Sequence, residues 1–418
     1  MRRALVLTLL LAACAPEPAP APPHAASAPV FSAGGWEADA LGRAAGYPPG
    51  VRTRRMERAE LVGSFTAYDR IWTARPIHGP PVASPLAREP EPAIRYDAGG
   101  GAQRDIDHYL ASNPATALLI AKDGRLLVER YQYARRDDMR FTSFSMAKTI
   151  TAMLFGIAMS EGHIRSLDDT AETYVPELRG SQYGRTPLRA LLSMSSGVAF
   201  SEVYDGKDDV SKLARDGFVG VGSGGPAVLR QFAARERAPD TKFSYASAET
   251  QVLGAVIVAA TGRSLADYAG EKIWRPLGAE ADASWLIDRA GLEAAFCCFQ
   301  AVARDWLRLG LMLANDGAWN GRQIVPRAWI VAATSVDPAR RHLAPGTATR
   351  YFGYGYQTWI FPGPDRTFAL LGVYGQTIAV DPANRIVMVH LSARATPTDP
   401  SGGQTFALWR GVRAALAK

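Results

Sequence analysis

The sequence predicts an α+β fold in which an antiparallel β-sheet is flanked by helices and carries an inserted all-helical lobe. Three features of this 418-residue chain support the prediction. Two apolar strand-like runs lie early, at 115–131, helical patterns fill the middle, and strand-like runs return at 354–391 before a last helix. Strands near both ends with helices between them favour a sheet that both ends complete, with the helices packed against it. A cleft between sheet and lobe is a natural place for a site.

The predicted elements follow in order along the chain. The run 115–131 holds two apolar stretches around Asp123 and Gly124, a dipeptide typical of tight hairpin turns. A helix is expected over 146–162, because apolar residues recur there at helical spacing and a glycine closes the pattern. Further helices are expected at 186–194, 227–237, 250–260, 265–273 and 301–314. Strands are expected at 354–361, 367–373, 376–380 and 385–391, and an amphipathic helix at 404–417.

Composition argues against several classes of protein. The net charge of +7 is spread along the chain, without basic runs interleaved with aromatic residues, so no nucleic-acid partner is expected. No stretch of eighteen or more apolar residues occurs, so no transmembrane helix is predicted. The six histidines never fall at metal-ligand spacing, so no metal site is predicted.

The N-terminus has the pattern of an export signal. Arg2 and Arg3 precede the apolar run ALVLTLLLAA, so residues 1–13 are predicted to be a signal peptide. The ending LAAC resembles a bacterial lipobox, which implies that Cys14 becomes the lipidated first residue of an exported membrane lipoprotein facing the periplasm. The alternatives are an ordinary signal peptide cut near Ala13, which would give a periplasmic protein, or a buried helix.

Three further segments follow the predicted signal. Residues 14–33, with the lipidated cysteine first, are rich in proline and alanine and are expected to form an extended tether. Residues 34–95 are proline-rich with little periodicity, and we expect them to wrap around the domain rather than fold alone. Residues 96–418 are predicted to form the main domain.

Two of the three cysteines, Cys297 and Cys298, are neighbours in the chain. Adjacent cysteines rarely bond to each other without strain, so no disulfide is predicted, despite the export signal. We interpret both as packed small apolar residues. A loop near the substrate is the alternative.

The stretch SFSMAKTI, at 143–150, combines a serine and a lysine in a way that suits catalysis. Ser145 and Lys148 stand three apart at the start of the expected helix, and therefore on one face of it. The positive end of the helix dipole favours negative charge on the serine oxygen. The helix is apolar around most of its circumference, so the lysine is expected to be buried with a lowered pKa, as a base needs. A capped helix with a surface lysine has the same spacing, and Ser143 is expected to be a turn or capping residue.

Two later motifs add a proton carrier and a substrate-binding strand edge. In FSYAS, the hydroxyl of Tyr245 can pass a proton between a nucleophile, a base and a leaving group if a cation lowers its pKa. In GVYGQ, at 372–376, glycine permits a close approach of substrate, and a backbone N–H beyond it can complete an oxyanion hole. Each of these motifs alone is more often structural.

Together and in this order, the motifs resemble those of the serine β-lactamase and penicillin-binding-protein superfamily. That superfamily carries Ser-x-x-Lys, Tyr-x-Asn/Ser and a strand-borne Lys/His-x-Gly motif. The chain is most similar to the branch of the 6-aminohexanoate-dimer (nylon-oligomer) hydrolases and related esterases, from Leu61 to the C-terminus. The stretches that carry this likeness are LVGSFTAYDRIWTARP, RFTSFSMAKTITAMLFGIAMSEG, LLSMSSGVAFSEVY, FSYASAETQVLG, CCFQAVARDWLRLGLML and GVYGQTIAVDP.

The resemblance implies a role for each motif residue. It makes Ser145 the acylated nucleophile, Lys148 its general base and Tyr245 the relay that protonates the leaving group. It implies a fold like that of β-lactamases and transpeptidases, and no cofactor. The oxyanion hole would consist of the backbone N–H groups of Ser145 and Gln376. The implied substrate-binding residues are Tyr204, Ser247, Tyr374, Gly375 and Gln376.

One departure from the family pattern bears on the substrate. The third motif reads Val373-Tyr374-Gly375 and lacks the lysine that helps β-lactamases and transpeptidases hold a carboxylate. The sequence therefore predicts a serine hydrolase that cleaves a small amide or ester, neutral rather than β-lactam, through an acyl-enzyme on Ser145. The alternatives are a β-lactamase or D-Ala-type cell-wall peptidase and, from another class, an inactive membrane-anchored binding protein. The sequence predicts no oligomeric state.

Overall fold

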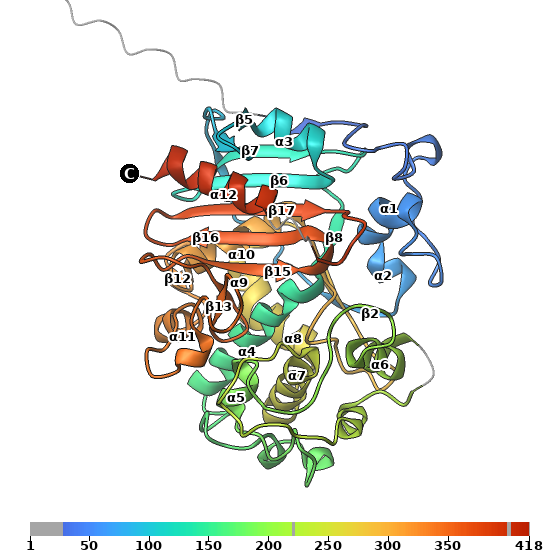
Figure 1. Ribbon diagram of the computed structural model, residues 1–418, viewed down its shortest axis with the longest axis vertical. Coiled ribbons are helices and arrows are strands. Elements are labelled where there is room, and N and C mark those ends of the chain that lie inside the picture. The colour runs from blue at the N-terminus through green and yellow to red at the C-terminus, as the bar shows by residue number, and fades with distance from the viewer. Residues whose placement is uncertain (1–27, 220–221, 399–402, 418) are drawn as a thin grey trace, which may run out of the picture.

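The structure is a computed structural model that describes residues 28–219, 222–398 and 403–417 (Figure 1). The predicted signal peptide and Cys14 lie outside the described residues.

The predicted early hairpin lies toward one edge of the main sheet. It consists of β6 (Ala115–Lys122) and β7 (Arg125–Tyr131), joined at Asp123 and Gly124, which both have positive φ. The late strands join it, because β17 (Ile386–Ser392) pairs antiparallel with β6 and is followed by β16 (Gln376–Asp381). β15 (Phe368–Gly372) continues the antiparallel order. Both ends of the domain therefore complete one sheet, as predicted.

The edges of this sheet differ from the prediction. The expected strand 354–361 is two short strands, β13 (Gly353–Tyr354) and β14 (Trp359–Ile360), because Gln357 between them has a positive φ and turns the chain. At the other edge, β1 (Val30–Phe31) and β3 (Ala87–Arg88) pair with β7 in parallel. The sheet is therefore mixed. The end of the predicted tether is a strand of the sheet instead of a free spacer, and the wrapping segment contributes a second strand.

Helices cover both faces of the main sheet. α10 (Ala303–Ala314) packs against β16, β17 and β6 on one face. The contact is close, because a Cβ at Gly310 would lie 2.5 Å from Cγ1 of Val387. The terminal helix α12 (Gly403–Leu416) and α3 (Ile106–Ser112) cover the opposite face, where α12 crosses in front of the strands in Figure 1.

A second, four-stranded antiparallel sheet was not predicted. Its strands are β2 (Ala74–Ile77), β9 (Ala283–Leu286), β10 (Phe299–Val302) and β8 (Arg140–Thr142), in that spatial order. Strands of three or four residues are too short to show a periodic pattern in the sequence. This sheet positions the site, because β8 leads directly to Ser143 and β10 follows the two cysteines.

The helical lobe lies below the sheet in Figure 1, with α4 (Ala147–Ser160) and α7 (Ser247–Thr261) packed together at its centre. Both helices were predicted. The expected helix 227–237 is wrong beyond a short 3-10 turn, Pro226–Gln231, because Arg235 pairs as a β-bridge with Val198. No single helix in the described part of the chain is long and apolar enough to span a membrane, although the bent pair Ser247–Thr261 and Leu265–Leu277 has sufficient length and apolar character together. The remaining helices are α1 (Leu61–Phe65), α2 (Tyr68–Ile71), α5 (Leu188–Leu192), α6 (Asp209–Ala214), α8 (Leu265–Ala269), α9 (Arg275–Leu277) and α11 (Arg327–Ala333).

Candidate active site

Ser145 lies on a tight turn between the second sheet and helix α4. β8 ends at Thr142, and the 3-10 turn Phe144–Met146 leads into α4. The Oγ of Ser143 donates to the carbonyl of Phe144 at 2.8 Å and accepts from the N–H of Phe299 at 2.9 Å. Ser143 is thus a turn residue, as predicted, and it ties this turn to β10. Ser145 itself is partly exposed.

Lys148 is buried directly beneath Ser145, with only 1% of its surface exposed. Its Nζ lies 2.9 Å from Oγ of Ser145, 3.0 Å from Oγ of Ser247 and 3.0 Å from the carbonyl oxygen of Phe296. Burial disfavours the charged ammonium and lowers the pKa of Lys148 to about 8. This confirms the predicted buried lysine and makes a neutral amine accessible near physiological pH.

Glu202 is a residue of the site that the sequence analysis missed. Its carboxylate accepts hydrogen bonds from the backbone N–H of Ser247 at 2.7 Å, from Oγ of Ser247 at 2.8 Å and from the hydroxyl of Tyr204 at 2.9 Å. Its negative charge raises the pKa of Lys148 and so opposes the effect of burial. The only signal in the sequence was its place two residues before Tyr204 in SEVY.

The directions of the hydrogen bonds around Lys148 leave the lone pair of its neutral amine for Ser145. The hydroxyl proton of Ser247 is directed at Glu202, so this oxygen can only accept from Lys148. The Phe296 carbonyl also only accepts. A neutral amine has two N–H groups, which these two acceptors occupy, and its lone pair is then left for the hydroxyl of Ser145. This is the orientation that a general base for a serine requires.

Tyr245 lies beside both Lys148 and Ser145. Nζ of Lys148 lies 4.9 Å from the centre of its ring, which stacks on Trp359 with centroids 5.3 Å apart. Burial and the charge of Glu202 raise the pKa of Tyr245, whereas a hydrogen bond with Ser145 lowers it. The expected lowering of the Tyr245 pKa by a cation is therefore wrong. The tyrosine is protonated at neutral pH, and its hydroxyl is within reach of Ser145.

The third motif contributes backbone more than side chains. Gly375 and Gln376 line a cavity beside Ser145, but the side-chain amide of Gln376 bonds to the backbone of Ser392, at 2.7 and 3.2 Å. Tyr374 differs from the prediction. Its ring packs on Phe65 and Phe144, with centroids 5.4 and 5.2 Å away, and it does not line either of the two cavities at Ser145.

A buried histidine supports Gly375 from behind. Nδ1 of His390 lies 2.8 Å from the carbonyl oxygen of Gly375, and its Nε2 lies 3.0 Å from the hydroxyl of Tyr109. Burial lowers the pKa of His390 to about 3, so the ring is neutral and donates from Nδ1 to the carbonyl. His390 thereby fixes the peptide that precedes Gln376.

Ser145 stands where two cavities meet. Both are lined by Ser145, Glu202, Tyr204 and Val373. The smaller, of about 160 Å³, is mainly apolar and is also lined by residues that include Phe144, Val210, Phe218, Phe296, Cys297 and Cys298. The larger, of about 450 Å³, is also lined by residues that include Tyr245, Trp359, Gly375, Gln376 and Arg394.

Arg394 places a guanidinium group at the site. It follows β17 and lines the larger cavity, with one guanidinium nitrogen 2.6 Å from Oγ1 of Thr405. The third motif itself carries no cation, as its sequence shows. The fold supplies one from a neighbouring strand.

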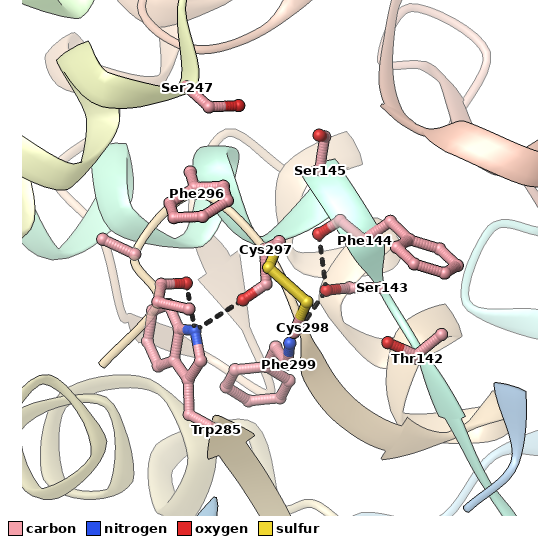
Figure 2. The surroundings of a disulfide bond; sticks show 12 residues. Thr142, Ser143, Phe144, Ser145, Ser247, Trp285, Phe296, Cys297, Cys298 and Phe299 are labelled. Atoms are coloured by element: carbon pink, nitrogen blue, oxygen red, sulfur yellow. Dashed lines mark hydrogen bonds between the residues drawn. A yellow bond between two sulfur atoms is a disulfide. The ribbon is translucent and has the colours of Figure 1, made fainter. Parts of the chain in front are cut away.

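The prediction about the cysteines is also wrong, because Cys297 and Cys298 form a disulfide (Figure 2). Cys298 has a left-handed backbone, with φ 66°, and the backbone around it is held by neighbouring groups. The carbonyl of Cys297 accepts from Nε1 of Trp285 at 3.0 Å, and the N–H of Cys298 donates to the carbonyl of Phe144 at 3.3 Å. This held turn brings two adjacent sulfur atoms together. The alternative of a loop near the substrate site is the one that the structure supports, since both cysteines line the smaller cavity.

Within the described residues, no group of three or more histidine, cysteine, aspartate or glutamate side chains is arranged to hold a metal ion.

Comparisons with known proteins agree with this architecture. The model of the family described as Beta-lactamase matches residues 102–409. The chain is 28% identical over 328 residues to the 6-aminohexanoate-dimer hydrolase of Paenarthrobacter ureafaciens, an alignment that covers 76% of this chain and 83% of that protein.

Solved structures show the same likeness. A proposed 6-aminohexanoate-dimer hydrolase from Bacillus anthracis has a TM-score of 0.77 at 25% identity, and the match covers 86% of this chain and 94% of that one. EstCE1, a hydrolase with promiscuous acyltransferase activity, has a TM-score of 0.57 at 18% identity, covering 72% and 93%. The second likeness concerns the fold alone.

Proposed function

Because the chain belongs to the β-lactamase family and is a serine hydrolase of the amidase and esterase kind, we propose that Ser145, Lys148 and Tyr245 are its catalytic residues. The observation that carries this proposal is the set of partners of Lys148. Two acceptors occupy the N–H groups of its neutral amine, and the third partner is Oγ of Ser145, at 2.9 Å.

In the first step Lys148 takes the proton of Ser145 while Oγ attacks the carbonyl carbon of an amide or ester. The oxyanion that forms accepts hydrogen bonds from the backbone N–H groups of Ser145 and Gln376. The positive φ of Gly375, 93°, and its bond to His390 set the direction of the peptide that carries the second of these groups.

In the second step the leaving group takes a proton from Tyr245, which recovers one from Lys148, and the acyl-enzyme remains on Ser145. Water then attacks the acyl carbon, with Lys148 as base, and releases the acid. Tyr245 lines only the larger of the two cavities. We therefore assign the leaving group to the larger cavity and the acyl part of the substrate to the smaller, apolar one.

Arg394 in the larger cavity favours a leaving group that carries a carboxylate, because a guanidinium pairs with carboxylates in bidentate fashion. The substrate class that we propose is a linear amide or ester with an apolar acyl part. Arg394 also supports a second candidate function, that of a D-Ala-type cell-wall peptidase or β-lactamase, because the substrates of these enzymes carry a carboxylate.

The experiment compares the wild type and Ser145→Ala on short nitrophenyl esters and on linear amides with and without a carboxylate in the amine part. The wild type is expected to be active and Ser145→Ala inactive. Mass spectrometry of the wild type should find an acyl group on Ser145 after reaction with substrate, or a phosphonate there after treatment with a phosphonate inhibitor. Equal rates in both proteins would contradict the mechanism. Stable labelling of Ser145 by a fluorescent penicillin would favour the second candidate.

We also propose that the protein is exported and anchored through lipidated Cys14. The N-terminal pattern of Arg2, Arg3 and LAAC supports this, and so does the disulfide, since such bonds persist in oxidising compartments. Mass spectrometry of the mature protein is expected to find acyl chains on Cys14. An unmodified N-terminus at another residue would refute the anchor.

A further inference from the structure

We propose that the Cys297–Cys298 disulfide is a positioning element for the catalytic base, holding the Phe296 carbonyl against Lys148, so that its reduction slows acylation. The inference rests on the proposed role of Lys148. It goes beyond that role, because the activity would depend on the redox state of a bond that lies outside Ser145, Lys148 and Tyr245.

The disulfide lies between Phe296 and the turn that holds Ser143 and Phe144 (Figure 2). On its N-terminal side, the Phe296 carbonyl accepts from Nζ of Lys148 at 3.0 Å. On its C-terminal side, the N–H of Cys298 donates to Phe144 at 3.3 Å, and the N–H of Phe299 donates to Ser143 at 2.9 Å. One side of the disulfide therefore holds the base, and the other holds the turn that carries Ser145.

The backbone of Cys298 is in a conformation that a residue with a Cβ rarely adopts. Its φ of 66° lies in the left-handed region, which is unfavourable for a non-glycine residue. The disulfide and the hydrogen bonds to Trp285 and Phe144 together retain this conformation. Once the disulfide is cut, Cys298 can relax to negative φ, which rotates the adjoining peptides and displaces the Phe296 carbonyl.

Displacement of that carbonyl changes what Lys148 can do. With only Ser247 left as an acceptor, one N–H of the neutral amine has no fixed partner and the lone pair is no longer directed at Ser145. The carbonyl also favours the ammonium form, because an acceptor stabilises a charged donor. Its loss should reduce kcat for acylation and move the acidic limb of the pH profile to lower pH.

The bond is accessible through the site itself. Cys297 is partly exposed, and both cysteines line the cavity that opens at Ser145. A small dithiol can enter there. One of its thiolates attacks a cysteine sulfur and forms a mixed disulfide, and its second thiol then displaces that sulfur. The S–S bond is thereby reduced to two cysteine thiols with two electrons, and the dithiol is oxidised to a cyclic disulfide.

The test uses the full chain, assayed on a nitrophenyl ester before and after treatment with dithiothreitol, with the new thiols counted. We expect kcat to fall roughly tenfold, which corresponds to about 1.4 kcal/mol, with recovery on reoxidation and with the shift of the acidic limb described above. An unchanged kcat and pH profile in protein with both thiols free would overturn the proposal. So would a change confined to KM, which would indicate that the sulfur atoms only line the pocket.

Two double variants separate positioning from folding. Cys297→Ala/Cys298→Gly should keep more activity than Cys297→Ala/Cys298→Ala, because glycine adopts positive φ without a disulfide. Equal activity of the two well-folded variants would contradict the argument, and circular dichroism checks the fold. Neither variant should respond to dithiothreitol.

A second measurement does not depend on activity. Enzyme with a phosphonate on Ser145 should be reduced more slowly than free enzyme, because the adduct covers the cavity. Equal reduction rates would contradict the placement of the sulfur atoms. If the proposed function is wrong, Ser145→Ala should be active whether the disulfide is oxidised or reduced. This result differs from every result that would contradict the role of the disulfide alone.

Discussion

Glu202 and Ser247 are joined by two hydrogen bonds, from the backbone N–H of Ser247 at 2.7 Å and from its Oγ at 2.8 Å. The first fixes the start of helix α7, and the second directs the hydroxyl proton of Ser247 away from Lys148. A carboxylate that does not contact Ser145 thus determines which way the proposed base, Lys148, faces.

Replacement of Glu202 by glutamine should alter both the rate and its pH dependence. The negative charge of Glu202 raises the pKa of Lys148, which burial lowers to about 8. Without that charge the pKa of Lys148 falls further, so the acidic limb of the kcat/KM profile should move to lower pH. The amide can also donate to Ser247 and disturb its orientation, which should lower kcat roughly tenfold or more.

Tyr204→Phe is the matched control, because it removes one hydrogen bond to Glu202 and keeps the charge. The acidic limb of the kcat/KM profile of Tyr204→Phe should stay near its wild-type position. An unchanged limb in Glu202→Gln would show that this carboxylate does not influence the base.

Tyr245→Phe should discriminate between amides and esters. An amine must be protonated to leave, whereas nitrophenolate leaves as an anion and needs no proton from Tyr245. We expect hydrolysis of a linear amide to fall by about 10²–10⁴ and hydrolysis of a nitrophenyl ester to fall much less. Parallel steady-state assays measure the ratio. An equal loss on both substrates would assign Tyr245 a role other than leaving-group protonation.

Gly375→Ala should impair catalysis through the backbone. Gly375 has φ 93°, and an added Cβ would lie 2.9 Å from Cβ of Ser392, so the peptide before Gln376 must shift. The oxyanion contact weakens, and loss of one such donor typically costs about 10²–10³ in kcat.

Gly321→Ala provides the control for the backbone strain alone. It has a similar φ of 73°, and an added Cβ there would meet nothing within 4 Å. Both variants should lose stability in urea unfolding, but only Gly375→Ala should lose kcat. A wild-type rate in Gly375→Ala would argue against the oxyanion role of Gln376.

Glu249→Gln should stabilise the protein at alkaline pH. Burial raises the pKa of Glu249 to about 8, and its partner is the hydroxyl of Ser196, at 2.6 Å. Because the folded-state pKa lies above the usual value, the folded state binds more protons between about pH 4.5 and 8, and wild-type stability falls as pH rises through this window. Glutamine removes this dependence, with a gain on the order of a few kcal/mol at pH 8.

Urea unfolding of Glu249→Gln at pH 5 and pH 8 measures this effect. The wild type should be less stable at the higher pH, whereas the variant should change less between the two values. If the stability of both proteins depends on pH in the same way, the group responsible for that dependence is not Glu249.

The longest and most regular patterns in the sequence predicted the fold correctly. The hairpin 115–131 follows from two apolar runs around an Asp-Gly turn, and helix α4 follows from the helical spacing of its apolar residues. The family follows from three motifs in order. The burial of Lys148 was predictable because the helix around it is apolar. The hairpin, the helix and the burial of Lys148 are local features, since each depends on residues within a few turns or strands of one another.

Contacts between distant segments were decided by the tertiary structure alone. Glu202 meets Ser247 across 45 positions, and the Phe296 carbonyl meets Lys148 across 148 positions. Arg394 enters the site because β17 pairs with β16, and Tyr374 turns away from it because its ring packs on Phe65 and Phe144. The Cys297–Cys298 disulfide depends on a left-handed backbone that Phe144 and Trp285 hold from other strands and turns. The sequence by itself determined which groups do the proposed chemistry, through local apolar periodicity and motif order. Only the packing of remote segments decided how those groups are oriented, because hydrogen-bond direction depends on atoms that are neighbours in space alone.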